Sequence, residues 1–252
     1  SAIQYEARFL SLFERDAEAI AVLREALEKI ESARIAAQLA VLEFEAGEFH
    51  TALATLERFD ALTPIKDKGT HSWLAGQRSD LFRRLGDLPR AIGQARLSTS
   101  GFYRRVAQRL EQAAPEARHH MLPVGFVRQH HMTCAPATLS ALSRYWTRPA
   151  DHLDLAAAIC YDGTPNHSQR RWATDHGWHV REFTATWDSA RALLDAGIPF
   201  TLATVHPGSS HLQAAIGYDE ARGTLLIRDP YERVHGEFAE EPFFESYRST
   251  GP

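Results

Sequence analysis

Residues 129–139 read Gln-His-His-Met-Thr-Cys-Ala-Pro-Ala-Thr-Leu, and this stretch decides how the second half of the chain is interpreted. Cys134 stands where an irregular polar segment gives way to a helix of small residues, expected over 135–146. Unpaired N–H groups and the helix dipole favour a thiolate at such a helix N-terminus. Gln129 lies five positions earlier, so its amide can point toward the same space. Cys134 is therefore a candidate nucleophile and Gln129 a candidate oxyanion donor, although a cysteine at a helix start is often only a small buried hydrophobe.

The composition of the 252 residues is that of an ordinary globular protein, with 44% hydrophobic and 24% charged residues. A net charge of −4 argues against a nucleic-acid partner, which would need a basic face. Two cysteines cannot form a disulfide framework in a chain of this size, which predicts a reducing, cytoplasmic compartment. No apolar run approaches the roughly 20 residues of a membrane span. Because the sequence starts at Ser1 without a signal-peptide profile, we expect the native chain to extend upstream.

Residues 1–114 have helical periodicity throughout, with apolar residues three and four positions apart. Short turn signals precede similar helices, whose marker alanines, Ala19, Ala52 and Ala91, lie 33 and 39 positions apart. The first spacing is close to the roughly 34-residue period of tetratricopeptide repeats, and the polar segment 63–69 accounts for the surplus in the second. The region thus resembles degenerate tetratricopeptide repeats, with an irregular helical bundle as the alternative. Stacked helix pairs of either kind offer a face for peptides, so we expect a protein partner or the substrate there.

The helical pattern breaks at 113–120, where a proline and polar residues intervene. This break predicts a helical domain over 1–114 and a second domain over 121–252. In the second domain, further helices are expected at 153–160, 167–176 and 187–195, and strands at 179–183, 198–205, 211–218, 224–228 and 234–238. Helices followed by an antiparallel sheet describe an α+β domain, so the predicted class of the whole chain is α+β with an all-α first part.

Two polar residues stand at the ends of neighbouring predicted strands. His211 opens the strand 211–218, and Asp229 follows the strand 224–228. If the turn at 219–223 joins these strands in a hairpin, the imidazole and the carboxylate meet at one edge of the sheet. A cysteine nucleophile needs such a pair, because histidine moves the proton and the carboxylate fixes the imidazole. Taken singly, a histidine at a strand end is usually just polar, and His206 is the competitor for this role.

The motifs of the second domain occur together in a fixed order. They are Gln129 to Leu139, Asp-Gly-Thr at 162–164, Ile-Pro at 198–199, His211 with Gly-Tyr-Asp at 217–219, and Arg-Asp-Pro at 228–230. Over residues 121–238 the chain resembles the papain-like bacteriocin-processing peptidases, which cleave double-glycine leader peptides, and especially their stand-alone relatives.

The resemblance implies a papain-like α+β fold, a peptide or protein substrate and no cofactor. It implies that Gln129 donates to the oxyanion, Cys134 is the nucleophile, His211 is the general base and acid, and Asp229 orients His211. The chain departs from the family at one position: Ala135 replaces the glycine that usually follows the cysteine. A β-carbon at this position would narrow the groove beside the nucleophile.

Three functional hypotheses remain open at this point. The first is a thiol peptidase whose substrate is recognised partly by the helical repeats. The second is the same triad used for acyl transfer or amide hydrolysis on a non-peptide substrate. The third is a binding module whose peptidase-like domain has lost activity. A zinc site is not expected, because the histidine pairs are adjacent in sequence and no Cys-x2-Cys motif occurs, and Cys160 is predicted to be buried in the core.

Overall fold

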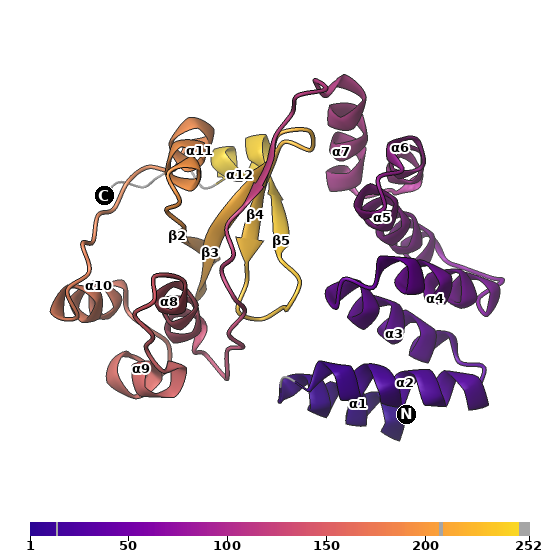
Figure 1. Ribbon diagram of the computed structural model, residues 1–252, viewed down its shortest axis with the longest axis horizontal. Coiled ribbons are helices and arrows are strands. Elements are labelled where there is room, and N and C mark those ends of the chain that lie inside the picture. The colour runs from indigo at the N-terminus through magenta and orange to yellow at the C-terminus, as the bar shows by residue number, and fades with distance from the viewer. Residues whose placement is uncertain (14, 207–208, 247–252) are drawn as a thin grey trace. The chain divides into compact units, whose positions relative to one another are not determined.

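The computed structural model describes residues 1–13, 15–206 and 209–246 (Figure 1). The chain divides into two compact units, Ser1–Ala113 and Ala114–Pro252. The first unit is helical and the second combines helices with an antiparallel sheet, so the predicted α+β class is confirmed. Within the described ranges, no helix has both the length and the apolar character needed to cross a membrane.

The described residues of the first unit form seven consecutive helices: α1 (Ala2–Leu12), α2 (Asp16–Lys29), α3 (Ala33–Glu45), α4 (Phe49–Ala61), α5 (Lys68–Arg84), α6 (Leu88–Leu97) and α7 (Gly101–Gln112). Helices pack in sequence order, with α1 against α2, α3 against α4, and α5 against α6 (Figure 1). Gly47 and Gly86 make the turns inside the second and third pairs with φ of 80° and 79°, a left-handed conformation that glycine adopts without a steric penalty. The structure thus has the same glycine turn in the second and third helix pairs. The assignment of these pairs to tetratricopeptide repeats stays a prediction.

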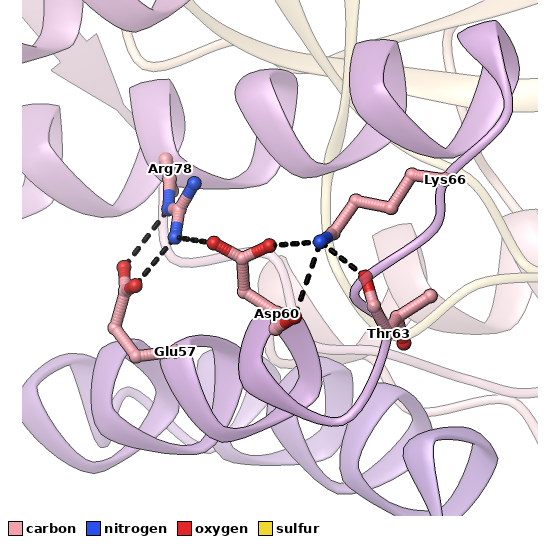
Figure 2. Close-up of polar contacts among 5 residues, drawn as sticks. All are labelled: Glu57, Asp60, Thr63, Lys66 and Arg78. Atoms are coloured by element: carbon pink, nitrogen blue, oxygen red, sulfur yellow. Dashed lines mark hydrogen bonds and ion pairs between the residues drawn. The ribbon is translucent and has the colours of Figure 1, made fainter.

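The polar loop between α4 and α5 is fixed by a network of charged side chains (Figure 2). Lys66 is only 7% exposed, and its Nζ lies 2.5 Å from Asp60 Oδ1. The same ammonium donates to the Asp60 carbonyl at 3.1 Å and to the Thr63 carbonyl. Arg78 of α5 donates to Asp60 Oδ2 at 2.7 Å and pairs with Glu57, so the two helices are tied directly. The polar residues between the second and third helix pairs thus form a loop that packs against α4.

The second unit contains a sheet with β3 at its centre. Its described elements are β1 (His119–Met121), α8 (Cys134–Tyr145), α9 (His152–Ile159), α10 (Asn166–Asp175), α11 (Trp187–Asp195), β2 (Phe200–His206), β3 (Ser209–Asp219), β4 (Thr224–Arg228), β5 (Gly236–Ala239) and α12 (Glu240–Ser246). All strand pairs are antiparallel: β1 and β2 both pair with β3, β4 pairs with β3, and β5 pairs with β4. Helices α8 and α11 pack against β3, and their apolar side chains share one core with those of β3 and β4.

Two segments differ from the sequence prediction. Residues 119–121 lie at the predicted boundary between the two domains, and they form the strand β1, which pairs with β3. Side chains help to hold this strand, because the ring of His119 lies 3.2 Å from Asp219 Oδ2 and the ring of His120 lies 3.0 Å from the Leu194 carbonyl. The strand predicted at 179–183 is wrong, since this segment belongs to no strand or sheet. Side-chain contacts hold it instead, including the edge-to-face packing of Phe183 on Phe200 at 5.3 Å.

Gly217 lies on β3, directly opposite Met121 of the neighbouring strand β1. A β-carbon at this position would stand 2.2 Å from the His120 carbonyl oxygen, so a side chain requires the strands to separate. We expect Gly217→Ala to lower the free energy of unfolding by about 1–3 kcal/mol, the usual range for overpacking. Gly236→Ala is the matched control, because a β-carbon there meets no atom within 4 Å. Thermal unfolding checks this, and equal melting temperatures for the two variants would contradict the close approach.

Candidate active site

Cys134 is the first residue of α8, as the sequence predicts. Its thiol is half-buried and hydrogen-bonded to the side chain of His211 and to the backbone N–H groups of Leu212 and Ala135. Burial alone would raise the pKa of this thiol, but the hydrogen bonds and the charge on His211 outweigh it, so the pKa is lowered. The site therefore favours a thiolate at Cys134.

His211 is held between the thiol and a carboxylate. Its Nε2 lies 2.9 Å from Asp229 Oδ1, which leaves Nδ1 as the ring nitrogen available to Cys134. The hydrogen bond to Asp229, followed by that to Cys134, raises the pKa of His211 to about 10 against the opposing effect of burial. Asp229 is itself fixed, because its Oδ1 also accepts from the Tyr231 N–H at 2.7 Å. His211 is therefore charged at neutral pH, and its charge favours ionisation of the Cys134 thiol.

An irregularity in β3 brings Asp229 to the same face as His211. The register of β3 with β4 shifts by one residue between Ala215 and Gly217, where Ile216 is the extra residue. Beyond this bulge Ala214 faces Arg228, so Asp229 comes opposite Gln213, on the face that also carries His211. Without the extra residue Asp229 would oppose Ala214 and point to the other face. The bulge is thus part of the construction of the site.

Gln129 is positioned by the turn that contains Asp229. Its backbone N–H donates to the Pro230 carbonyl at 2.9 Å, so the segment before Cys134 is tied to the segment after β4. The amide oxygen of Gln129 is buried and makes no hydrogen bond within the part of the chain that the structure describes. The amide oxygen therefore keeps unused hydrogen-bonding capacity.

Ala135 is buried in the first turn of α8. The residue is 1% exposed, so its β-carbon contributes almost nothing to the open surface beside the thiol. The backbone N–H of Ala135 donates to the Cys134 thiol, as does the backbone N–H of Leu212. Sequence reasoning missed both donors, because a backbone N–H leaves no signature in the residue type. Helix α8 and β3 are locked together at this point, since Thr138 Oγ1 donates to the Leu212 carbonyl at 3.0 Å.

The prediction that Cys160 is buried in the core is wrong. Cys160 follows the last residue of α9, is half-buried, and its thiol donates to the Met132 carbonyl at 3.4 Å. The alanine-rich helix before it suggested an apolar environment, but the cysteine lies beyond the helix end and contacts the turn that leads into Cys134.

The remaining histidines are dispersed over separate places. His119 and His120 belong to β1, and their rings contact Asp219 and the Leu194 carbonyl. The ring of His130 lies 5.2 Å from that of His152. Within the described ranges, no three His, Cys, Asp or Glu residues are arranged to hold a metal ion. The backbone of His206 pairs with Ser209 at the end of β2, and its side chain, like Pro207 and Gly208, lies outside what the structure describes.

A cavity of about 540 Å³ lies between α8, α10, the segment 178–183 and β2. Much of its lining is aromatic or aliphatic: Trp146, Trp172, Trp178, Phe183, Phe200 and Leu212. Leu212 connects the cavity with the thiol, because its N–H faces Cys134 while the residue also lines the cavity. A volume of this size is typical of pockets that bind small molecules or side chains.

Residues 121–252 match the sequence model of the Peptidase_C39 like family. The chain belongs to this family. The resemblance read from the motifs is thereby confirmed, and the second unit of this C39-like chain is a cysteine peptidase domain of papain-like α+β fold. The chain is also similar to the crystal structure of the peptidase domain of Streptococcus ComA, a bi-functional ABC transporter involved in a quorum-sensing pathway. Identity is 19%, the match covers 48% of this chain and 89% of that one, and the TM-score is 0.41. No curated protein matches the sequence.

The environments of the two cysteines predict different reactivities in this C39-like protein. The pKa of Cys134 is lowered, so at any pH near neutrality a larger fraction of this thiol is ionised than of an ordinary cysteine, and that fraction falls as the pH falls. Cys160 instead donates a hydrogen bond to the Met132 carbonyl at 3.4 Å. Brief iodoacetamide treatment at pH 7 should label Cys134 first, as read by peptide mass spectrometry.

Asp229→Ala is expected to slow this labelling. Loss of the carboxylate lowers the pKa of His211, which weakens the imidazolium that stabilises the thiolate, so the labelling curve should move to higher pH. Equal labelling of Cys134 and Cys160 in folded wild-type protein, or an unchanged curve in Asp229→Ala, would contradict the electrostatic account.

Proposed function

We propose that the C39-like unit hydrolyses peptide bonds through Cys134, His211 and Asp229, with Gln129 as oxyanion donor. The observation that carries this proposal is the bridging position of His211, which is bonded to the Cys134 thiol on one side and to Asp229 at 2.9 Å on the other. Such an imidazole can take a proton from the nucleophile side and return it to the leaving group, while the carboxylate stabilises its charged form.

The reaction begins with the Cys134 thiolate attacking the carbonyl carbon of the scissile bond. The resulting oxyanion accepts from the Gln129 amide and the Cys134 backbone N–H. When the C–N bond breaks, the imidazolium of His211 gives its proton to the departing amine and a thioester remains on Cys134. Neutral His211 then removes a proton from the water that attacks the thioester. Collapse of the second tetrahedral species releases the carboxylate product and restores the thiolate and the imidazolium.

A peptide-library digestion tests this function, with wild type and Cys134→Ala side by side. The expected result is a set of cleaved peptides that appears only with the wild-type protein. We also expect an apolar preference at one subsite, because the cavity of about 540 Å³ shares Leu212 with the nucleophile. Added hydroxylamine should divert part of the acyl group from acid to hydroxamate, because it competes with water for the thioester on Cys134. Cleavage that survives in Cys134→Ala would rule out this mechanism.

We further propose that the helical domain, with the predicted boundaries 1–114 and 121–252 for the two domains, recruits a protein substrate or partner. Its stacked helix pairs are the type of surface on which peptides commonly bind. A protein that contains the cleavage sequence should then have a lower KM than a short peptide with the same sequence, at similar kcat. Equal KM values would contradict recruitment by the helices.

A further inference from the structure

The turn that leads into the nucleophile is strained and depends on one hydroxyl group. Met132 has a left-handed φ of 56°, a conformation that residues with a β-carbon rarely adopt. Thr133 occupies the N-cap of α8, where a threonine hydroxyl ordinarily accepts from an N–H of the helix, yet it makes no such bond. Instead its Oγ1 accepts from the His130 N–H at 2.8 Å, so this side chain closes the turn that precedes the helix.

Helix α9 contacts this turn at both of its ends. At its start, His152 Nε2 lies 3.0 Å from Thr133 Oγ1, and the two residues are only 6% and 8% exposed. Just beyond its end, the Cys160 thiol donates to the Met132 carbonyl at 3.4 Å. The proposed mechanism uses neither His152 nor Cys160.

We propose that α9 is a brace for the 130–133 turn, with His152 and Cys160 as positioning residues that set Cys134 relative to His211 and Gln129. The inference rests on the proposed function, because it concerns the placement of the same nucleophile. The two oxyanion donors lie at opposite sides of this turn, one on Gln129 and the other at the Cys134 N–H. Donors and nucleophiles act efficiently only when they are held within a fraction of an ångström of their working positions.

The protonation state of His152 fits this role. Burial, followed by repulsion from His130 and Arg144 and opposed by attraction to Asp151, lowers the pKa of His152. The imidazole is therefore neutral at pH 7. Since Thr133 Oγ1 already accepts from the His130 N–H, its own proton can be donated to Nε2 of the neutral ring. The Thr133 hydroxyl then accepts one hydrogen bond and donates the other.

The test measures the pH dependence of iodoacetamide alkylation at Cys134, followed at that residue by mass spectrometry. Thr133→Val and His152→Leu should each raise the midpoint of the curve by about one pH unit, because a displaced thiol loses part of its interaction with His211. The double variant should be no worse than either single one, since both remove the same bond. Thr133→Ser and His152→Gln keep a hydrogen-bonding atom and should retain the wild-type midpoint.

Ser140→Ala is the matched control for a purely structural effect. It removes a bond of similar length, from Ser140 Oγ to the Ala150 carbonyl at 2.7 Å, which joins α8 to the loop before α9 and lies away from the turn. It should lower the melting temperature and leave the alkylation midpoint unchanged. Thr133→Val and His152→Leu midpoints that stay at the wild-type value would overturn the brace. A wild-type midpoint at the ordinary thiol pKa of about 8.5 would show that His211 does not stabilise the Cys134 thiolate. That result would contradict both the brace and the proposed peptidase mechanism.

Discussion

Replacement of Cys134 or His211 by alanine is expected to lower kcat by on the order of 10⁴-fold or more, and replacement of both should cost no more than either alone. The two side chains act as one unit, because the thiolate exists through the imidazolium and the imidazolium has no role without the nucleophile. The interaction with His211 that lowers the pKa of the Cys134 thiol is the basis of this expectation.

Steady-state cleavage of a peptide identified from the library measures this effect. His119→Ala is the control for histidine loss, since His119 pairs with Asp219 and contributes to β1 rather than to the triad. Additive losses for Cys134→Ala and His211→Ala would show that the two residues act in separate steps, and the proposed mechanism would then be wrong.

The second large effect is expected for Gln129→Ala, which should lower kcat by about a hundredfold or more with little change in KM. An oxyanion donor acts on charge that exists only in the transition state, so its loss leaves ground-state binding intact. Gln38→Ala, in the helical unit, is the control for loss of a glutamine amide. A rise in KM at constant kcat for Gln129→Ala would assign this residue to substrate binding instead.

Sequence reasoning found the residues whose placement depends on local structure. Cys134 was predictable because a helix of small residues starts directly at it, and His211 and Asp229 because a short turn joins their two strands. The hairpin alone, however, does not determine which face Asp229 occupies. That depends on the extra residue Ile216, and a bulge of this kind has no distinct signal in an apolar strand.

Contacts between segments that are distant in sequence were not predictable. The pairing of Thr133 with His152 and the contact of Cys160 with Met132 require knowledge of how α9 packs on the turn. The mistaken strand at 179–183 has a different cause, since all five of its residues are exposed and the alternating pattern does not correspond to one buried face. A short alternation of apolar and polar residues is therefore not sufficient evidence of a strand.

Cys134 is expected to become acylated during peptide cleavage. Rapid acid quenching of the wild-type protein during turnover of a library-derived peptide, followed by mass spectrometry of the digested protein, tests this. We expect a thioester on the fragment that contains Cys134, with a mass increase equal to that of the N-terminal product acyl group, and no adduct in His211→Ala. Cleavage without an adduct on Cys134, or with the adduct on Cys160, would contradict it.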